Sequence, residues 1–382
     1  MMKAPELDPG FSTPALSEIW SAASRVRRMC QAEAALASAC ARAGLIPESA
    51  ARSIQRACAK AIDDPATLLD DGWTAGTSLI PLLARLREGL GVDEARFLHF
   101  GATSQDILDT ATVLQLRDSL AVLRLLLDEV AERLAFLIEH HAEDWVMART
   151  LMQPALPIRF SLRAARWLNP IVQYLEDVVG AVDGLPVQLG GPAGDLATYG
   201  PAAGVVMRAF AEELHLTMPL VPWHTDRTPI VAGVGLANRI ACAAESIAAD
   251  LVLLSQAEIG EVRLPAGGSS AMPHKRNAIG AIHAIAAARA CHGVASIVAA
   301  APPHELERAA GSWHAEWFAV PLCLQSAGAA LRATRDALRG TTFDAARARR
   351  NLEGAALPDP RAGDGLVERV LQRYRERPRP GA

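Results

Sequence analysis

This chain has few aromatic residues and no excess of positive charge. Of its 382 residues only 5% are Phe, Trp or Tyr, and the formal net charge is −4. Non-specific binding of nucleic acid needs clustered Lys and Arg, so the charge balance argues against a nucleic-acid partner. Hydrophobic residues reach 51%, with alanine and leucine prominent. This composition favours long helices that pack closely through small side chains.

Long apolar runs and paired cysteines are also missing. No stretch approaches the roughly 18 uninterrupted apolar residues of a membrane span, and residues 1–6 turn acidic and contain a proline, unlike a signal peptide. We therefore expect a cytoplasmic protein with no membrane partner. The cysteines form no CxxC pair, so we expect small buried residues of a reduced protein, neither zinc ligands nor disulfides. They are Cys30, Cys40, Cys58, Cys242, Cys291 and Cys323.

Familiar catalytic and cofactor motifs are absent as well. The sequence has no HExxH, no Walker loop and no nucleophile elbow. The glycine-rich runs at residues 188–195 and 233–235 follow no predicted strand, which excludes a dinucleotide-binding interpretation. No sets of His, Asp and Glu share a metal-ligand spacing. We predict neither a cofactor nor a metal site.

Hydrophobic periodicity predicts helices along most of the chain. The clearest example is a heptad stripe on a helix of about 35 residues, ~50 Å long. It consists of Leu116, Leu120, Leu123, Leu127, Val130, Leu134 and Leu137. Other helices are predicted at residues 17–42, between the break at 44–47 and residue 62, and at 75–90, 159–182, 233–262, 277–300 and 366–374, with one more ending near 339. The fold class is therefore all-α, a bundle of long helices whose stripes could also form an oligomer core.

We divide the chain into three parts. Residues 1–98 form an N-terminal helical subdomain, and residues 99–340 form the central long-helix bundle. Residues 341–382 form a C-terminal segment rich in Pro, Gly and Arg, for which a short helix and a loose tail are expected.

A glycine- and serine-rich loop at residues 267–277 interrupts the aliphatic pattern. Ser269 and Ser270 lie ahead of Lys275 and Asn277, and an Ala/Ile-rich helix follows. Glycine and serine hold a helix poorly. Two hydroxyls beside fixed positive charge at a helix start fit an anion site. A solvated interhelical loop explains the composition equally well.

Two further polar stretches lie at predicted helix ends. Thr103, followed three residues later by Asp106, resembles a capping box with a shorter acid. Thr103, Ser104 and Gln105 thus lie where free N–H groups and the helix dipole favour a carboxylate, although a purely structural cap is the simpler alternative. The third stretch surrounds Gln153, where prolines break the chain before the helix at 159–182.

Together the three stretches resemble the fumarase class II/aspartase superfamily. Residues 268–277 read GSSAMPHKRN, similar to its GSSxMPxKxN signature. Residues 99–106 and 150–157 are similar to its other two conserved regions and occur in the same order. Within the superfamily, these stretches and residues 311–317 are most similar to the 3-carboxy-cis,cis-muconate cycloisomerases. The resemblance extends from about residue 10 to 350.

The resemblance implies a fold, an assembly and a site. It implies a homotetramer around a central helical bundle, active sites assembled from three chains, and a small polycarboxylate substrate without cofactor or metal. Ser269 is expected to be catalytic, exchanging a proton with the carbon next to a carboxylate. The expected substrate-binding residues are His99, Thr103, Ser104, Gln105, Gln153, Ser270, Lys275, Asn277 and Arg308. The signature loop is expected to be mobile without ligand.

Leu151 is the main departure from the family pattern. Many lyases of the superfamily carry a His there, which assists the departure of nitrogen or oxygen. A carboxylate with a pKa near ~4 leaves unassisted, so a leucine suits lactone chemistry. We expect reversible lactonisation of 3-carboxymuconate in aromatic catabolism. An adenylosuccinate-lyase-like or other fumarate-releasing enzyme and an inactive scaffold remain alternatives. Pro154 is also unusual, and the C-terminal segment is shorter than in longer relatives.

Overall fold

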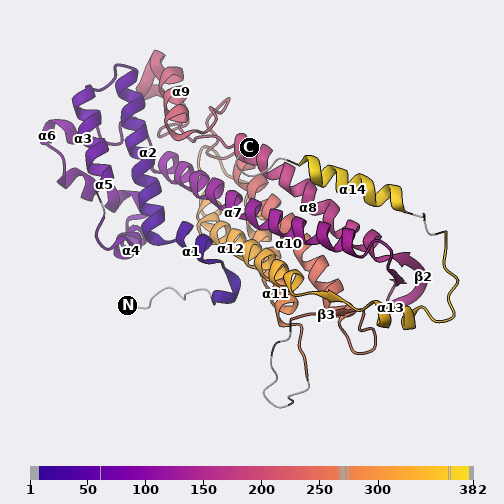
Figure 1. Ribbon diagram of the computed structural model, residues 1–382. Helices are drawn as coiled ribbons and strands as arrows, with labels where there is room; N and C mark the ends of the chain where they lie inside the picture. The colour runs from indigo at the N-terminus through magenta and orange to yellow at the C-terminus, as the bar shows by residue number, and fades with distance from the viewer. Residues whose placement is uncertain are drawn as a thin grey trace.

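The computed structural model describes residues 8–60, 62–265, 267, 272, 275–359, 361 and 363–377. Its regular structure is almost entirely helical (Figure 1), so the all-α prediction is confirmed. The helices are η1 (Pro9–Phe11), α1 (Pro14–Ile19), α2 (Ala22–Arg42), α3 (Glu48–Ala59), α4 (Pro65–Ala75), α5 (Leu79–Glu88), α6 (Val92–Ala95), α7 (Ser104–His140), α8 (Phe160–Asp183), η2 (Ala197–Ala202), α9 (Ala203–Leu214), α10 (Thr228–Leu254), α11 (Ile279–Ala300), α12 (Ser312–Arg339), α13 (Ala345–Asn351) and α14 (Asp364–Glu376). The strands are β1 (Trp145–Thr150), β2 (Gln153–Arg159), β3 (Val262–Arg263) and β4 (Thr342–Phe343).

The long helices α7, α8, α10, α11 and α12 form the central bundle. Helix α10 packs against α8, α11 and α12, and α7 packs against α8 and α12. The predicted heptad stripe of α7 is confirmed as core, because each of its residues between Leu116 and Leu137 is at most 1% exposed. Burial of apolar surface stabilises the packing of these helices by roughly 25 cal/mol for each Å² removed from water.

The two ends of the bundle differ chemically. Helices α7, α10 and α12 all begin at one end, where Arg227 ahead of α10 pairs with Asp109 of α7 and Glu316 of α12. We call this the cap end. At the opposite end, the hairpin end, α7 and α10 finish and the β1–β2 hairpin, the β3–β4 pair and α13 gather (Figure 1). The 37 residues of α7 separate the two ends by ~55 Å at 1.5 Å per residue.

A second hydrophobic core lies at the cap end. Helices α2, α3 and α5 pack there together with α9, which comes much later in the chain. Ile54, Leu79 and Phe210 are completely buried, and so are Ile107 and Leu114 from the early turns of α7. The N-terminal helices therefore hold the start of α7 in place.

Two predicted helix boundaries are wrong. The predicted helix at residues 17–42 is divided into α1 and α2, because the Ser21 hydroxyl accepts a hydrogen bond from Ser24 N at 3.1 Å and starts a new helix. The helix predicted at residues 233–262 runs instead from Thr228 to Leu254. After it, Gly260 adopts a left-handed conformation with φ 60°, and Val262 pairs with Phe343 in the β3–β4 ladder.

The region of Gln153 precedes helix α8, as predicted, and also forms a β-hairpin that the sequence does not predict. Strands β1 and β2 are antiparallel, with an irregularity between Met147 and Arg149. The sequence hides β2 because it contains Pro154 and Pro157, which cannot donate to a ladder and are confined to edge strands.

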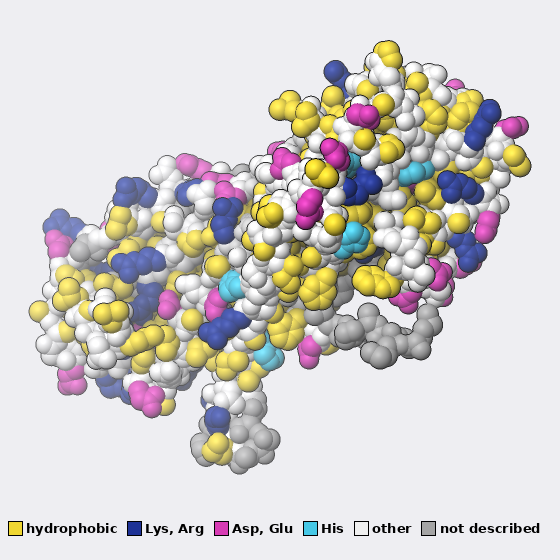
Figure 2. All heavy atoms as spheres, turned by 180° about the vertical axis from the view of Figure 1, so that it is seen from behind, with side chains coloured by type: hydrophobic (Ala, Val, Ile, Leu, Met, Phe, Trp, Pro, Cys, Tyr) yellow, Lys and Arg dark blue, Asp and Glu magenta, His cyan; other side chains and the backbone are white. Residues whose placement is uncertain are grey.

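Apolar surface remains along the bundle. Helices α10 and α11 are long and apolar enough to cross a membrane, although the sequence prediction found no such stretch. In α10, 56% of the most apolar window is buried inside the bundle, as in a core helix, whereas in α11 only 39% is buried. Hydrophobic side chains are spread over the face shown in Figure 2.

The expectation that all cysteines are buried is wrong for Cys242, which is exposed, and Cys58, which is half-buried.

Candidate active site

The cap end presents the start of α7, with Thr103 as its N-cap. The Asp106 carboxylate accepts a hydrogen bond of 2.9 Å from Thr103 N, so the predicted capping interaction is present. The same carboxylate, completely buried, also accepts from Gly190 N and Gly191 N at 2.9 Å each and contacts His224 Nε2 at 2.7 Å. The glycine-rich run therefore packs against the start of α7 through its backbone N–H groups.

Close packing explains one of these glycines. A Cβ at Gly190 would lie 2.7 Å from the His224 ring and 2.9 Å from Pro222. No real Cβ atom tolerates such distances without displacement of its neighbours. Gly190 therefore allows the loop backbone to approach Asp106 and His224 together.

Gln105 and Arg308 meet at this end. The Gln105 side chain is buried, and its amide N–H groups donate to His224 O at 2.9 Å and to Asp109 Oδ2 at 3.1 Å. Its Oε1 accepts from Arg308 Nε at 3.1 Å, while the Arg308 side chain is otherwise exposed. The structure brings these two predicted residues together, although 203 positions separate them in the chain.

A buried ion network fixes the helix ends below them. Arg227 donates to both oxygens of Asp109 at 2.7 and 2.9 Å and to both oxygens of Glu316 at 2.9 and 2.6 Å. Trp313 Nε1 donates to Asp109 Oδ1 at 2.9 Å. Burial alone would lower the pKa of Arg227, but Asp109 and Glu316 raise it above its ordinary value. The guanidinium therefore stays charged and joins α7, α10 and α12.

His99 connects the site to helix α2. Its Nδ1 lies 2.6 Å from Oε1 of the buried Glu33, and its backbone is left-handed with φ 61°. Burial alone would lower the pKa of His99, but the Glu33 carboxylate, helped by Asp106, raises it above its ordinary value. His99 thus adds a group that is readily cationic beside the start of α7.

The hairpin end carries the other predicted residues. Gln153 pairs with Thr150 across a two-residue turn formed by Leu151 and Met152, whose φ angles are 49° and 64°. Side chains with a Cβ adopt this region at a cost, which functional sites tolerate. Leu151 is 97% exposed and Met152 70% exposed. The chain thus holds an apolar tip out in solvent.

The signature loop also starts and ends at the hairpin end. Gly267 N donates to Asn277 O at 3.0 Å, closing the base of the loop. Lys275 is exposed and Asn277 is half-buried. The predicted catalytic Ser269 and the predicted Ser270 lie outside the described residues.

The predicted site residues therefore form two groups within one chain. His99, Thr103, Ser104, Gln105 and Arg308 lie at the cap end, and Gln153, Lys275 and Asn277 lie at the hairpin end. Because α7 spans ~55 Å between the ends, one small molecule cannot touch both groups of the same chain. Within the described part of the chain, no group of three or more His, Cys, Asp and Glu side chains is arranged to hold a metal ion.

Comparison with known proteins identifies the family. A family model described as lyase matches residues 10–291. The chain belongs to this lyase family, part of the fumarase class II/aspartase superfamily. Among curated members, the 3-carboxy-cis,cis-muconate cycloisomerase of Pseudomonas putida is 40% identical over 91% of this chain and 84% of its own length. The nitrosuccinate lyase of Streptomyces davaonensis is 37% identical over 85% of this chain and 72% of its own.

Solved lyase structures share the fold. The 3-carboxy-cis,cis-muconate lactonizing enzyme from Pseudomonas putida has a TM-score of 0.84 and 37% identity, covering 95% of this chain and 86% of that one. A fumarate lyase from Mesorhizobium also has a TM-score of 0.84, with 33% identity, covering 92% and 80%. The family resemblance predicted from the motifs is confirmed.

The cap end of this lyase is suited to hold a carboxylate. Free N–H groups at the start of α7 and the helix dipole attract negative charge, and the exposed Arg308 guanidinium lies beside them. Sequence reasoning missed the residues that position this surface, namely Asp109, Arg227 and Glu316. The only available signal was Trp313 and its neighbours, since charged residues from three distant segments give no local pattern.

Proposed function

We propose that this protein is a 3-carboxy-cis,cis-muconate cycloisomerase, which interconverts 3-carboxymuconate and 4-carboxymuconolactone in aromatic catabolism. The observation that carries the proposal is its similarity, at 37–40% identity over 88–92% of the chain, to four cycloisomerases of that name. Leu151 at the exposed hairpin tip supports this reaction over amine or hydroxide release. A leucine cannot protonate a basic leaving group, and a carboxylate needs no such help.

We infer that the working enzyme is a homotetramer whose sites combine different chains. The ~55 Å between the two groups of site residues supports sites that combine different chains, if the groups act together. Helix α11 is largely apolar and offers a contact surface, because its Ile282 and Ile297 side chains are 44% and 37% exposed. The apolar tip at Leu151 and Met152 would likewise be covered in a neighbouring site.

The chemistry assigns a role to each group. During lactonisation, an oxygen of one substrate carboxylate adds to a carbon of the conjugated double bond, and the adjacent carbon receives a proton from the Ser269 hydroxyl, which regains one from solvent. Lys275 and Asn277 stabilise the charge that develops on the neighbouring carboxylate. Thr103, Ser104 and Gln105 hold a second carboxylate and Arg308 holds a third, with His99, Gln153 and Ser270 completing the pocket. In reverse, Ser269 removes the same proton.

The proposed substrate also suggests where the enzyme works in the cell. The substrate is a small water-soluble polyanion, so we propose a cytoplasmic enzyme without a membrane or nucleic-acid partner. The apolar face of α11 would then pack against other chains and not against lipid. Neither a cofactor nor a metal is required by the proton transfer that we propose.

A turnover assay tests the function. Purified protein should remove the ultraviolet absorbance of the 3-carboxymuconate diene, and Ser269→Ala should abolish this while leaving the helical circular dichroism unchanged. Release of fumarate from adenylosuccinate or argininosuccinate would favour the lyase alternative, and nitrosuccinate serves as a further comparison substrate. A well-folded tetramer that turns over none of these compounds would support the inactive scaffold.

A further inference from the structure

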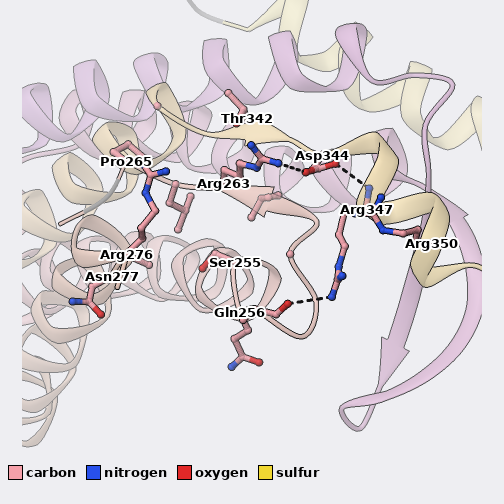
Figure 3. A pocket seen from close by; sticks show the side chains of 16 residues that line it. Ser255, Gln256, Arg263, Pro265, Arg276, Asn277, Thr342, Asp344, Arg347 and Arg350 are labelled. Carbon is pink, nitrogen blue, oxygen red and sulfur yellow. Dashed lines mark hydrogen bonds and ion pairs between the residues drawn. The ribbon is translucent and has the colours of Figure 1, made fainter. Parts of the chain in front are cut away.

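A separate polar pocket lies at the hairpin end, beside the base of the signature loop (Figure 3). It has a volume of about 670 Å³ and lies between the end of α10, strand β3 and the start of α13. This volume suits a small organic ligand. Among the described residues predicted to bind substrate, Asn277 alone lines this pocket. The pocket thus adjoins the loop but is remote from Gln105 and Arg308.

The lining is strongly cationic. It contains Arg263, Arg276, Arg347 and Arg350 against one carboxylate, Asp344. A concave surface lined by one sign of charge concentrates the field and attracts counter-ions. Four guanidinium groups around a small pocket therefore favour an anion.

Two of these arginines already have structural partners. Arg263 Nη2 donates to Asp344 Oδ2 at 2.6 Å. Arg347 donates to the backbone carbonyls of residues 257–259 at 2.7 to 3.1 Å, holding the segment after α10. The Arg347 backbone N–H and the Arg263 guanidinium lower the pKa of Asp344, so this carboxylate stays charged and fixed in place.

The other two arginines are available. Arg276 and Arg350 are exposed, and within the part of the chain that the structure describes neither side chain makes a hydrogen bond or a salt bridge, although the charge of Arg350 helps to lower the pKa of Asp344. Figure 3 shows Arg276 entering from the loop side and Arg350 from α13, on opposite sides of the pocket. A planar guanidinium binds carboxylate or phosphate oxygens in a bidentate manner. Two of them across one pocket fit a ligand with two separated anionic groups.

We propose that this pocket is a second anion site, which binds a small polyanion carrying two or more carboxylate or phosphate groups between Arg276 and Arg350. The site adjoins the proposed active site, with which it shares Asn277, and does not depend on which reaction that site catalyses. Arg276 and Asn277 adjoin Lys275 in the chain, and Asn277 O accepts from Gly267 N at 3.0 Å. A bound polyanion therefore braces the C-terminal anchor of the signature loop.

Calorimetric titration of the full chain at low ionic strength tests the proposal. The probes are tricarballylate, which offers carboxylates only, and pyrophosphate, which offers phosphates only. Arg350→Gln should weaken binding of at least one probe by roughly tenfold, the usual effect of losing a charge-assisted contact. Arg349→Gln is the matched control, because Arg349 is exposed on the same helix and lines a different depression.

The outcomes separate this site from the active site. Tighter binding of tricarballylate or of pyrophosphate identifies the ligand group, and either supports the proposal. Bound probe should also slow hydrogen exchange of Gly267 N–H in the wild type and not in Arg350→Gln. Equal weakening by both arginine variants, unchanged binding in Arg350→Gln, or no binding of either probe would overturn it. Failure of the turnover assay would leave these binding results unaffected.

Discussion

Gln105 Oε1 accepts a hydrogen bond from Arg308 Nε at 3.1 Å, joining the start of α7 to the turn that precedes α12. This contact places an exposed guanidinium beside the start of α7, where free N–H groups favour an anion. Two features that bind carboxylates, a helix N-terminus and a guanidinium, therefore lie on one surface.

Replacement of Arg308 should damage catalysis without damaging the fold. We expect Arg308→Met to lower kcat/KM by roughly 100-fold, because one charge-assisted contact to a substrate carboxylate is lost. Its free energy of unfolding should fall by only about 1 kcal/mol, because Gln105 Oε1 loses one hydrogen bond while the Arg308 side chain is otherwise exposed. Steady-state kinetics and urea unfolding measure the two effects. Arg52→Met, which removes a surface partner of Glu48, controls for loss of charge, and equal kinetic losses in both variants would refute the role.

Replacement of Arg227 should strongly destabilise the fold. Arg227→Met leaves the carboxylates of Asp109 and Glu316 buried without their cation. Breaking a buried ion pair in this way costs about 3–5 kcal/mol. Urea unfolding followed by circular dichroism provides the value. Arg42→Met, at a surface pair with Glu212, should cost less than ~1 kcal/mol, and a similar small loss in Arg227→Met would show that the network is not structural.

The pair of His99 and Glu33 predicts a pH dependence. The pKa of His99 is raised in the folded chain above the unfolded value of about 6.5. Its protonation therefore stabilises the fold fully below pH ~6.5, and this contribution is lost as the pH rises through the folded pKa. Urea unfolding between pH 5.5 and 8.5 should show the decline, and Glu33→Gln should reduce it. A histidine NMR titration in which His99 has an ordinary or lowered pKa would contradict the prediction.

The parts of the fold that the sequence predicts are those specified by local patterns. The stripe from Leu116 to Leu137 repeats with helical period, and Thr103 and Asp106 lie at capping distance, so both the long helix and its start are predictable. Each pattern needs only neighbouring residues. The motifs at Thr103 and Gln153 likewise identify the family, because their residue types and order are specific.

Long-range pairing explains what the sequence does not predict. His224 lies 118 positions from Asp106, and Arg227 lies 118 from Asp109, so neither contact leaves a local signal. The β1–β2 hairpin is hidden by prolines in β2 and by a turn that uses Leu151 in a conformation typical of glycine or asparagine. The sequence also does not predict which site residues lie at the same end of the bundle, because this depends on the direction in which each helix runs.

The left-handed backbone of Leu151 predicts that replacing this residue by glycine raises stability and lowers activity. Leu151→Gly should raise the free energy of unfolding by up to ~1 kcal/mol, because glycine adopts φ 49° without strain. The same variant should lose activity, since the apolar side chain no longer lines a neighbouring site. Thermal unfolding and the diene assay measure both. His215→Gly, at φ 52° on the exposed end of α9, should gain similar stability with full activity, and full activity in Leu151→Gly would remove the proposed role of the tip.

The most direct test of the account is complementation between two inactive variants. If Thr103 and Ser269 of one site come from different chains, mixing Thr103→Val with Ser269→Ala and reassembling the tetramer should restore activity. Random assembly at equal amounts leaves about a quarter of the sites with both wild-type residues, so we predict about a quarter of wild-type turnover of 3-carboxymuconate. Turnover that stays at the level of the separate variants, with mixed tetramers demonstrated by mass spectrometry, would contradict a site shared between chains.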